Sequence, residues 1–131
     1  MAFKINKSIV RGTGEHKDLV FKMKRKKLGN GIAGEANNDG TIFVSKDIPK
    51  NSPMEAEVVA HEGDHMLRME TGELGYDDNS VTWRGNKYPR KDGKIKYKGS
   101  WKPEGDKSFP WEKLAYKVGT KAKKEATKKN K

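Results

Sequence analysis

A chain of 131 residues has room for one small domain and none for a separate substrate-binding module. Only 32% of it is hydrophobic and 36% is charged, so the sequence predicts a thin core. The chain has no cysteine, which excludes disulfides and thiolate metal ligands. No segment is apolar enough to span a membrane, and the N-terminus lacks the apolar region of a signal peptide. We therefore expect a soluble protein without a membrane partner.

The net charge of +11 comes largely from two lysine-rich segments. Residues 22–27, from Lys22 to Lys27, alternate so that lysines occupy one face of a predicted strand. Residues 121–131, from Lys121 to Lys131, carry six lysines and one glutamate, a composition typical of flexible, solvated tails. Both segments suit non-specific binding of nucleic acid or another polyanion. The alternative is that the charge only keeps the protein soluble, and the sequence leaves both open.

The N-terminal part predicts a small sheet. Residues 1–18 contain glycines and mixed charges, which indicate a loosely ordered segment. Strands are expected at residues 19–27, 32–36 and 41–45, the last rich in β-branched and aromatic types. Asp39-Gly40 favours a type I′ hairpin turn between the second and third of them. We expect the three strands to form an antiparallel meander.

A helix is predicted at residues 53–70, because signals for both of its ends are present. Ser52 suits the N-cap, Pro53 the first helical position and Glu55 the third, and Gly72 is placed as a C-terminal glycine. Gly63 is a poor helix former in mid-helix, with a cost of about 1 kcal/mol against alanine. We interpret it as a place where another element approaches closely.

Within this helix stands an H-E-x-x-H motif, formed by His61, Glu62 and His65. Residues i and i+4 share one helical face, so both imidazoles can reach the same metal ion. The glutamate between them is placed to act as general base on a water held by that metal. The alternative is a surface helix that carries two histidines by chance, but the cap, the register and the spacing agree.

Residues 76–106 contain many turn signals between short aromatic pieces. Asp92-Gly93 favours a hairpin between Tyr88 and Tyr97. The segment holds two tryptophans and three tyrosines, which suits the wall of a functional site. Aromatic residues that merely anchor this segment to a thin core would give the same pattern, and both interpretations stay open.

A catalytic zinc normally has three protein ligands, so a third must lie outside the motif. A short second helix is expected between Ser108, its predicted cap, and Gly119, its predicted end. Glu112 lies in the first turn of this helix and is the preferred third ligand. His16, the remaining histidine, and the pair Asp77 and Asp78 are the alternatives. Glu112 would also favour a helix N-terminus without binding a metal.

His61-Glu62-x-x-His65 on one helix, followed by a glutamate on a second, resembles the gluzincin group of zinc metallopeptidases, and most closely its minimal members. The resemblance covers roughly residues 31–119. It implies Zn²⁺ held by His61, His65 and Glu112, with Glu62 as the base. Many gluzincins have an aspartate one turn after the glutamate ligand, and here Ala115 and Tyr116 stand instead. Support for the histidines must then come from elsewhere.

A weaker resemblance, carried by residues 81–85 and 110–112, is to small phage-encoded proteins of this type. It implies a protein that is cytoplasmic or associated with a virion, and one that forms part of a phage particle.

The sequence therefore predicts an α+β zincin-like fold, a small antiparallel meander packed against two metal-binding helices. The domain would span residues 19–119, with residues 120–131 as a flexible tail. The expected function is zinc-dependent hydrolysis of a peptide or protein substrate, bound as an added strand at a sheet edge. Tyr88, Arg90 and Tyr97 are candidates to stabilise the oxyanion. The alternatives are a non-catalytic basic phage or nucleoid-associated protein on the same scaffold, binding DNA or a protein partner, and a hydrolase of another amide such as peptidoglycan.

Overall fold

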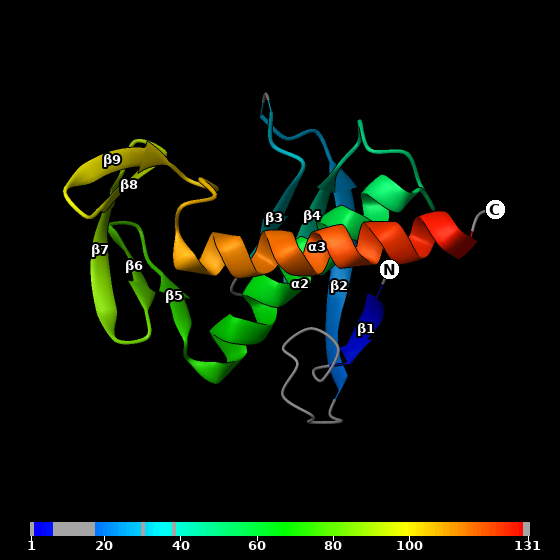
Figure 1. Ribbon diagram of the computed structural model, residues 1–131, viewed down its shortest axis with the longest axis horizontal. Helices are drawn as coiled ribbons and strands as arrows, with labels where there is room; N and C mark the ends of the chain where they lie inside the picture. Colours follow the sequence, from blue (N-terminus) through cyan, green and yellow to red (C-terminus); the bar gives the residue numbers. More distant parts are fainter. Residues whose placement is uncertain (1, 7–17, 30, 38, 130–131) are drawn as a thin grey trace.

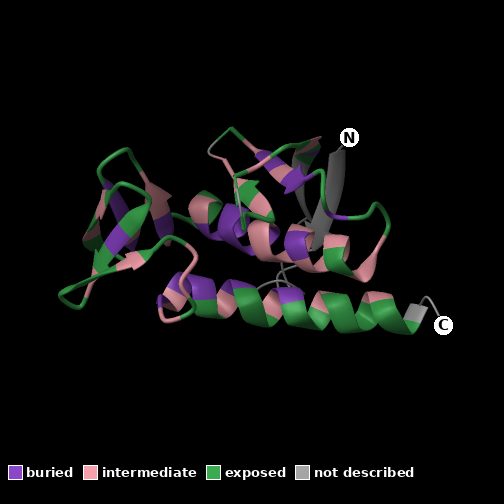
Figure 2. Ribbon diagram, turned by 90° about the horizontal axis from the view of Figure 1, so that it is seen from above, coloured by how far each residue is buried: buried purple, intermediate pink, exposed green. Residues whose placement is uncertain are grey.

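Two helices pack across each other. One sheet lies against the first helix, and a second sheet lies at the end of the first helix and the start of the second (Figure 1). The computed structural model describes residues 2–6, 18–29, 31–37 and 39–129. Seen from above, the first sheet, helix α2 (Pro53–Thr71) and helix α3 (Pro110–Lys129) follow one another as layers (Figure 2). The α+β class is thus confirmed. No helix in the described part of the chain has the length and apolar character needed to cross a bilayer.

The first sheet contains β1 (Ala2–Asn6), β2 (Asp18–Lys26), β3 (Gly34–Ala36) and β4 (Thr41–Ser45), in the spatial order β1-β2-β4-β3. The hairpin between β3 and β4 is antiparallel, as expected, but β2 pairs with β4 in parallel. The meander predicted for these strands is therefore wrong. Four of the five residues of β4 are buried, so this strand takes a central place with a partner on each side. The short strand β3 is left at the edge.

The N-terminal segment, expected to be loosely ordered, contributes β1, which pairs antiparallel with β2. Residues 7–17, with His16, lie outside the described residues. The predicted strand 19–27 corresponds to β2 and the predicted strand 41–45 to β4, whereas β3 begins two residues later than expected.

The second sheet is an antiparallel meander in chain order. It contains β5 (Leu74–Tyr76), β6 (Ser80–Trp83), β7 (Asn86–Lys91), β8 (Lys94–Tyr97) and β9 (Ser100–Pro103). The Asp92-Gly93 hairpin between β7 and β8 is confirmed, with φ angles of 52° and 74°. Arg84-Gly85 and Lys98-Gly99 make the same kind of two-residue turn with positive φ at both positions. Because these short turns connect consecutive strands, the aromatic segment forms a sheet rather than a long loop.

Helix α2 follows its prediction closely. The Ser52 hydroxyl accepts from the backbone N–H of Glu55 at 3.1 Å, and Pro53 stands in the first turn. At the other end Gly72 has a φ of 83° and donates to the carbonyl of Met69. The helix runs one residue further than predicted, to Thr71.

Helix α3 is much longer than predicted, since it runs through Gly119 to Lys129. Most of the residues beyond Gly119 are alanine, lysine and glutamate, which are good helix formers, so the expected tail continues the helix instead of leaving it. Ser108 is not its cap either. The Ser108 hydroxyl donates to Asp106 and accepts from Lys102.

Two separate hydrophobic clusters hold these layers together. One lies between the first sheet and α2, around Ile42, Val44 and Val58. The other joins the second sheet to the start of α3, where Phe109 and Trp111 are fully buried with Trp83. The aromatic side chains of the second sheet therefore serve mainly as core. Met69 packs against both clusters and links them.

Gly119 marks the point where α3 passes closest to the histidine turn of α2. A Cβ atom on Gly119 would lie 2.9 Å from the carbonyl oxygen of Glu57 and 3.5 Å from Cβ of His61. A side chain here would have to push the two helices apart, which explains a glycine in mid-helix despite its low helical propensity.

We expect Gly119→Ala to lower the free energy of unfolding by about 1–2 kcal/mol, because the overpacking cost exceeds the gain in helical propensity. Thr120→Ala is the matched control, since Thr120 is exposed and adjacent, and it should leave stability unchanged or raise it slightly. Chemical denaturation with circular dichroism measures both. A Gly119→Ala protein as stable as the parent would contradict the close helix crossing.

Candidate metal centre

Two imidazoles and one carboxylate converge between the helices. His61 and His65 lie one turn apart on α2, and Glu112 stands in the first turn of α3. The Nε2 atom of His61 lies 2.9 Å from Oε1 of Glu112, and Nε2 of His65 lies 3.1 Å from the same carboxylate. The three donor atoms lie within 4.8 Å of one another, a group that could hold one metal ion. The pairing of the motif with Glu112 is thus found in the fold.

The other ligand candidates do not join this group. Within the described residues the cluster of potential ligands contains only His61, His65 and Glu112. Asp77 instead accepts hydrogen bonds from Asn79 and Ser80, in the turn between β5 and β6. Asp78 is exposed in the same turn.

The three side chains are largely buried, and contacts among them shift the pKa values of His65 and Glu112. Side-chain exposure is 14% for His61, 5% for His65 and 7% for Glu112. Burial alone would raise the pKa of Glu112, but hydrogen bonds from both histidines outweigh it and lower that pKa to about 2. For His65, burial lowers the pKa, and the bond to Glu112 more than reverses this, so the pKa is raised. In this contact Glu112 favours the protonated form of His65.

Glu62 stands beside this group and faces a cleft of about 1010 Å³. Burial raises its pKa, while the positive charges of His65 and His61 act in the opposite direction. Strand β3 lies against it, because Gly34 leaves no side chain in the way. A Cβ on Gly34 would lie 2.6 Å from Cγ1 of Val58 and 3.1 Å from Cγ of Glu62. The exposed edge of the first sheet is thereby held next to the glutamate.

Tyr116 takes the place where the gluzincin pattern has an aspartate, and it supports His61 by packing. The two rings meet edge to face, with centroids 4.5 Å apart. The hydroxyl of Tyr116 donates to the carbonyl of Gly105 at 3.1 Å, which ties the ring to the loop before α3. Tyr116 follows Glu112 by four residues, and this spacing was the sequence signal for a residue that supports His61. The signal predicts a hydrogen-bonding side chain, whereas the structure has an aromatic ring.

His65 lacks the second hydrogen bond that usually orients a metal-binding histidine. Its buried Nδ1 atom finds no hydrogen-bond partner among the described residues, and the same holds for Oδ1 of its neighbour Asp64. The other oxygen of Asp64 accepts from Nε of Arg68 at 3.0 Å. The ring of His65 is therefore held by packing and by Glu112.

The candidates for oxyanion stabilisation are separated by the fold. Arg90 lines the cleft, with its guanidinium bonded to Glu104 and to the carbonyl of Asp77. Tyr88 and Tyr97 are not among the residues that line it. They pack with Trp111 in the second core, at ring distances of 5.7 Å and 6.1 Å.

Tyr76, at the end of β5, lines the cleft instead. Burial raises the pKa of its hydroxyl well above the usual range, and the charges of Glu112 and Glu62 add to this. The guanidinium of Arg90 lies over its ring, 5.7 Å from the centroid. Sequence reasoning missed Tyr76, because nothing local distinguishes it from the tyrosines that point into the core.

Comparisons with protein-family models, with curated proteins and with solved structures find no match to this chain. What the site can do must therefore be judged from its own donors, burial and charges.

We expect one Zn²⁺ to bind per chain and His61→Ala to abolish this binding, because one imidazole and one carboxylate are too few ligands for a tight zinc site. Glu112→Gln should weaken it strongly, since the amide offers no negative charge. His16→Ala is the matched control and should keep the metal. Elemental analysis and calorimetric titration measure the stoichiometry and the affinity.

Because the core is thin, a chelator should also lower the melting temperature of the metal-loaded protein, and it should leave that of His61→Ala unchanged. A parent protein that takes up no zinc, or a His16→Ala protein that loses it, would contradict the assignment of ligands.

Proposed function

We propose that the protein is a zinc-dependent metallopeptidase of gluzincin type. The observation that carries this is the convergence of His61, His65 and Glu112 at a cleft that Glu62 also lines. Two imidazoles and one carboxylate leave room for a further ligand, which is the arrangement of catalytic rather than structural zinc. The tight contact of these residues, far apart in sequence, argues that they act together.

The donor set fits Zn²⁺, since imidazole nitrogen and carboxylate oxygen are common zinc ligands and thiolates are absent from the chain. When bound, zinc would supply Lewis acidity toward water and toward the scissile carbonyl. A proton on His65 would leave when the metal binds, because ligating imidazoles must be neutral.

Glu62 is suited to move the proton. Its carboxylate would accept a proton from the attacking water and then pass it to the leaving amine. A general base works best when its pKa is raised toward the working pH, and burial acts on Glu62 in that direction.

The edge of the first sheet suggests how a peptide would bind. β3 is an edge strand, and residues 31–37 line the cleft next to Glu62. An extended peptide could add to this edge through backbone hydrogen bonds, with its carbonyl directed toward the metal ligands. Gly34 makes this possible by letting the strand lie against α2.

Tyr76 is the side chain that we propose for the oxyanion, in preference to Tyr88 and Tyr97. It lines the cleft, and the stack with Arg90 fixes its ring. A raised pKa keeps the hydroxyl protonated, so that it can donate a hydrogen bond to developing negative charge.

Glu62→Gln should keep the zinc and lose peptidase activity, because the change removes the base and nearly preserves the shape. We would measure zinc content and cleavage of a broad peptide library in parallel, with Glu125→Gln as control, because Glu125 is exposed and does not line the cleft. Glu62→Gln that cleaves as fast as the parent would refute the mechanism. If the parent cleaves no peptide but does cleave peptidoglycan, the substrate class changes; if it cleaves neither, a non-catalytic scaffold is favoured.

Tyr76→Phe should lower kcat by about 100-fold and leave zinc affinity unchanged, since it removes one donor to the oxyanion. Tyr88→Phe tests the earlier candidate with the same chemical change. Steady-state kinetics on a cleaved peptide decide between the two. A loss in Tyr88→Phe without one in Tyr76→Phe would reverse the assignment.

A further inference from the structure

Helix α3 carries a straight row of lysines on the side turned away from α2. The row consists of Lys113, Lys117, Lys121, Lys124 and Lys128, all of them exposed. Successive members are three or four residues apart, so they share one helical face. Over the helical rise the row extends for roughly 22 Å.

Glu125 is the one acidic neighbour of this row on α3, four residues after Lys121 and three before Lys128. Within the described residues none of the five lysines makes an ion pair, whereas the neighbouring Lys123 lies 3.9 Å from Glu57 on α2. Because the segment is helical and not a flexible tail, the charges are held at fixed spacing.

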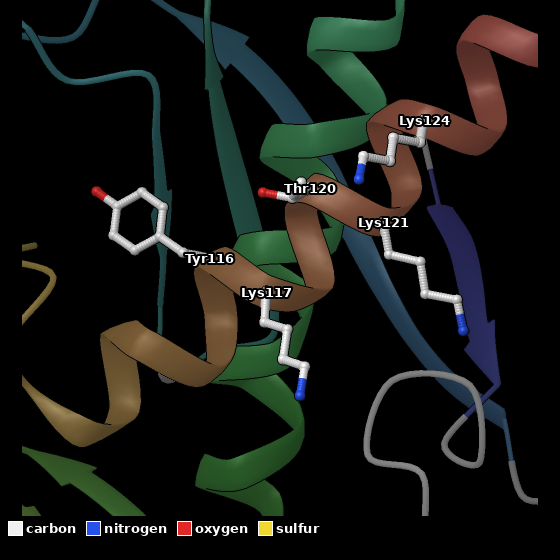
Figure 3. Close-up of a pocket in the computed structure, with 5 residues that line it drawn as sticks. All are labelled: Tyr116, Lys117, Thr120, Lys121 and Lys124. Atoms are coloured by element: carbon white, nitrogen blue, oxygen red, sulfur yellow. The ribbon is translucent and has the colours of Figure 1, made fainter.

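A shallow hollow lies among these lysines, next to the metal cleft. It measures about 390 Å³ and is lined by Tyr116, Lys117, Thr120, Lys121 and Lys124 (Figure 3). Tyr116 and Thr120 also line the cleft, so the hollow and the cleft adjoin. A polymer that lies along the row would therefore pass the mouth of the cleft.

We propose that the lysine row of α3 binds the phosphate backbone of a nucleic acid duplex, without reading its sequence. Lysines at regular spacing along a straight helix complement a rigid polymer with regularly spaced negative charge. A row of lysine ammonium groups suits contacts to phosphate oxygens, and such contacts carry no sequence information. The inference does not rest on the proposed peptidase activity.

An anionic membrane is a poorer fit to this face. Helices that bind membranes in the interfacial plane bury an apolar side in the lipid. In α3 the small residues opposite the lysines, such as Ala115 and Gly119, are buried against α2 and the site. Apart from Tyr116, the exposed residues of α3 are polar or charged.

The lysines of β2 belong to a different surface. Met23 is buried in the core on the α2 side of the sheet, so its neighbours Lys22 and Lys24 point to the other side. The sheet and α3 lie on opposite sides of α2 (Figure 2). The two basic segments therefore cannot grip one duplex together, and β2 offers a matched control.

The test compares two variants that each lose four lysine charges. The first replaces Lys117, Lys121, Lys124 and Lys128 by Gln, and the second replaces Lys22, Lys24, Lys26 and Lys27 by Gln. Glutamine keeps helical propensity close to that of lysine, so α3 should persist, and circular dichroism checks this. Binding is measured by fluorescence anisotropy on a labelled DNA duplex of arbitrary sequence, at several salt concentrations.

The parent should bind with a slope of log K against log salt of about −4 to −5, which means a loss of roughly 500-fold between about 50 and about 200 mM salt. The α3 variant should lose most of this slope and bind at least about tenfold more weakly at the lower salt, while the β2 variant stays close to the parent. Glu62→Gln should bind DNA like the parent, whether or not the peptidase proposal holds.

Three results would overturn the proposal. The first is a parent that does not bind duplex at low salt. The second is an equal loss in the α3 and β2 variants, which would mean that only net charge matters. The third is binding to vesicles with anionic lipid, lost in the α3 variant, in the absence of duplex binding.

Discussion

The contact between two imidazoles and one buried carboxylate is the constraint on which this small fold depends. Glu112 sits between His61 and His65, with little exposure to solvent, at the crossing of the two helices. A buried carboxylate is costly unless hydrogen bonds compensate it, and here both histidines lie within hydrogen-bonding distance of Glu112. Any shift of α3 along or away from α2 would separate these groups. The relative position of the two helices is therefore tightly constrained.

That crossing is set by packing at both ends of the site. On one side Gly119 lets α3 approach the backbone of Glu57 and the Cβ atom of His61. On the other, Trp111 is buried among aromatic residues of the second sheet, which holds the first turn of α3 in place. Glu112 follows Trp111 directly, so the second sheet acts largely by positioning this carboxylate, as the core-anchoring interpretation of its aromatic residues predicted. Tyr76 and Arg90 are the parts of it that reach the cleft.

Negative charge is concentrated in the cleft, and positive charge is concentrated on the surface. The cleft concentrates carboxylates, among them Glu62 and Glu112, whereas the protein as a whole carries a net charge of +11. The outer face of α3 concentrates part of the positive excess at a distance of one helix diameter from the acidic centre. The candidate metal centre and the lysine row lie on different faces of α3, so mutations can alter one without the other.

Much of the chemistry of the site was readable from the sequence, because it depends on local spacing. The His61 and His65 pair, Glu62 between them and the caps at Ser52 and Gly72 all follow from helical periodicity and backbone preferences within one segment. The Asp92-Gly93 hairpin was predictable for the same reason. Glu112 could be proposed as third ligand, but its contact with the histidines is a property of the fold.

What only the tertiary structure decided involves partners distant along the chain. The parallel pairing of β2 with β4 reflects the burial of β4 on both sides, which no local pattern shows. Gly119 resembled a helix stop and is a crossing point, since its neighbour is the backbone of another helix. The tyrosines illustrate the same limit: Tyr76 and Tyr88 look alike in sequence and both pack against the second core, and only the fold places Tyr76 at the cleft as well.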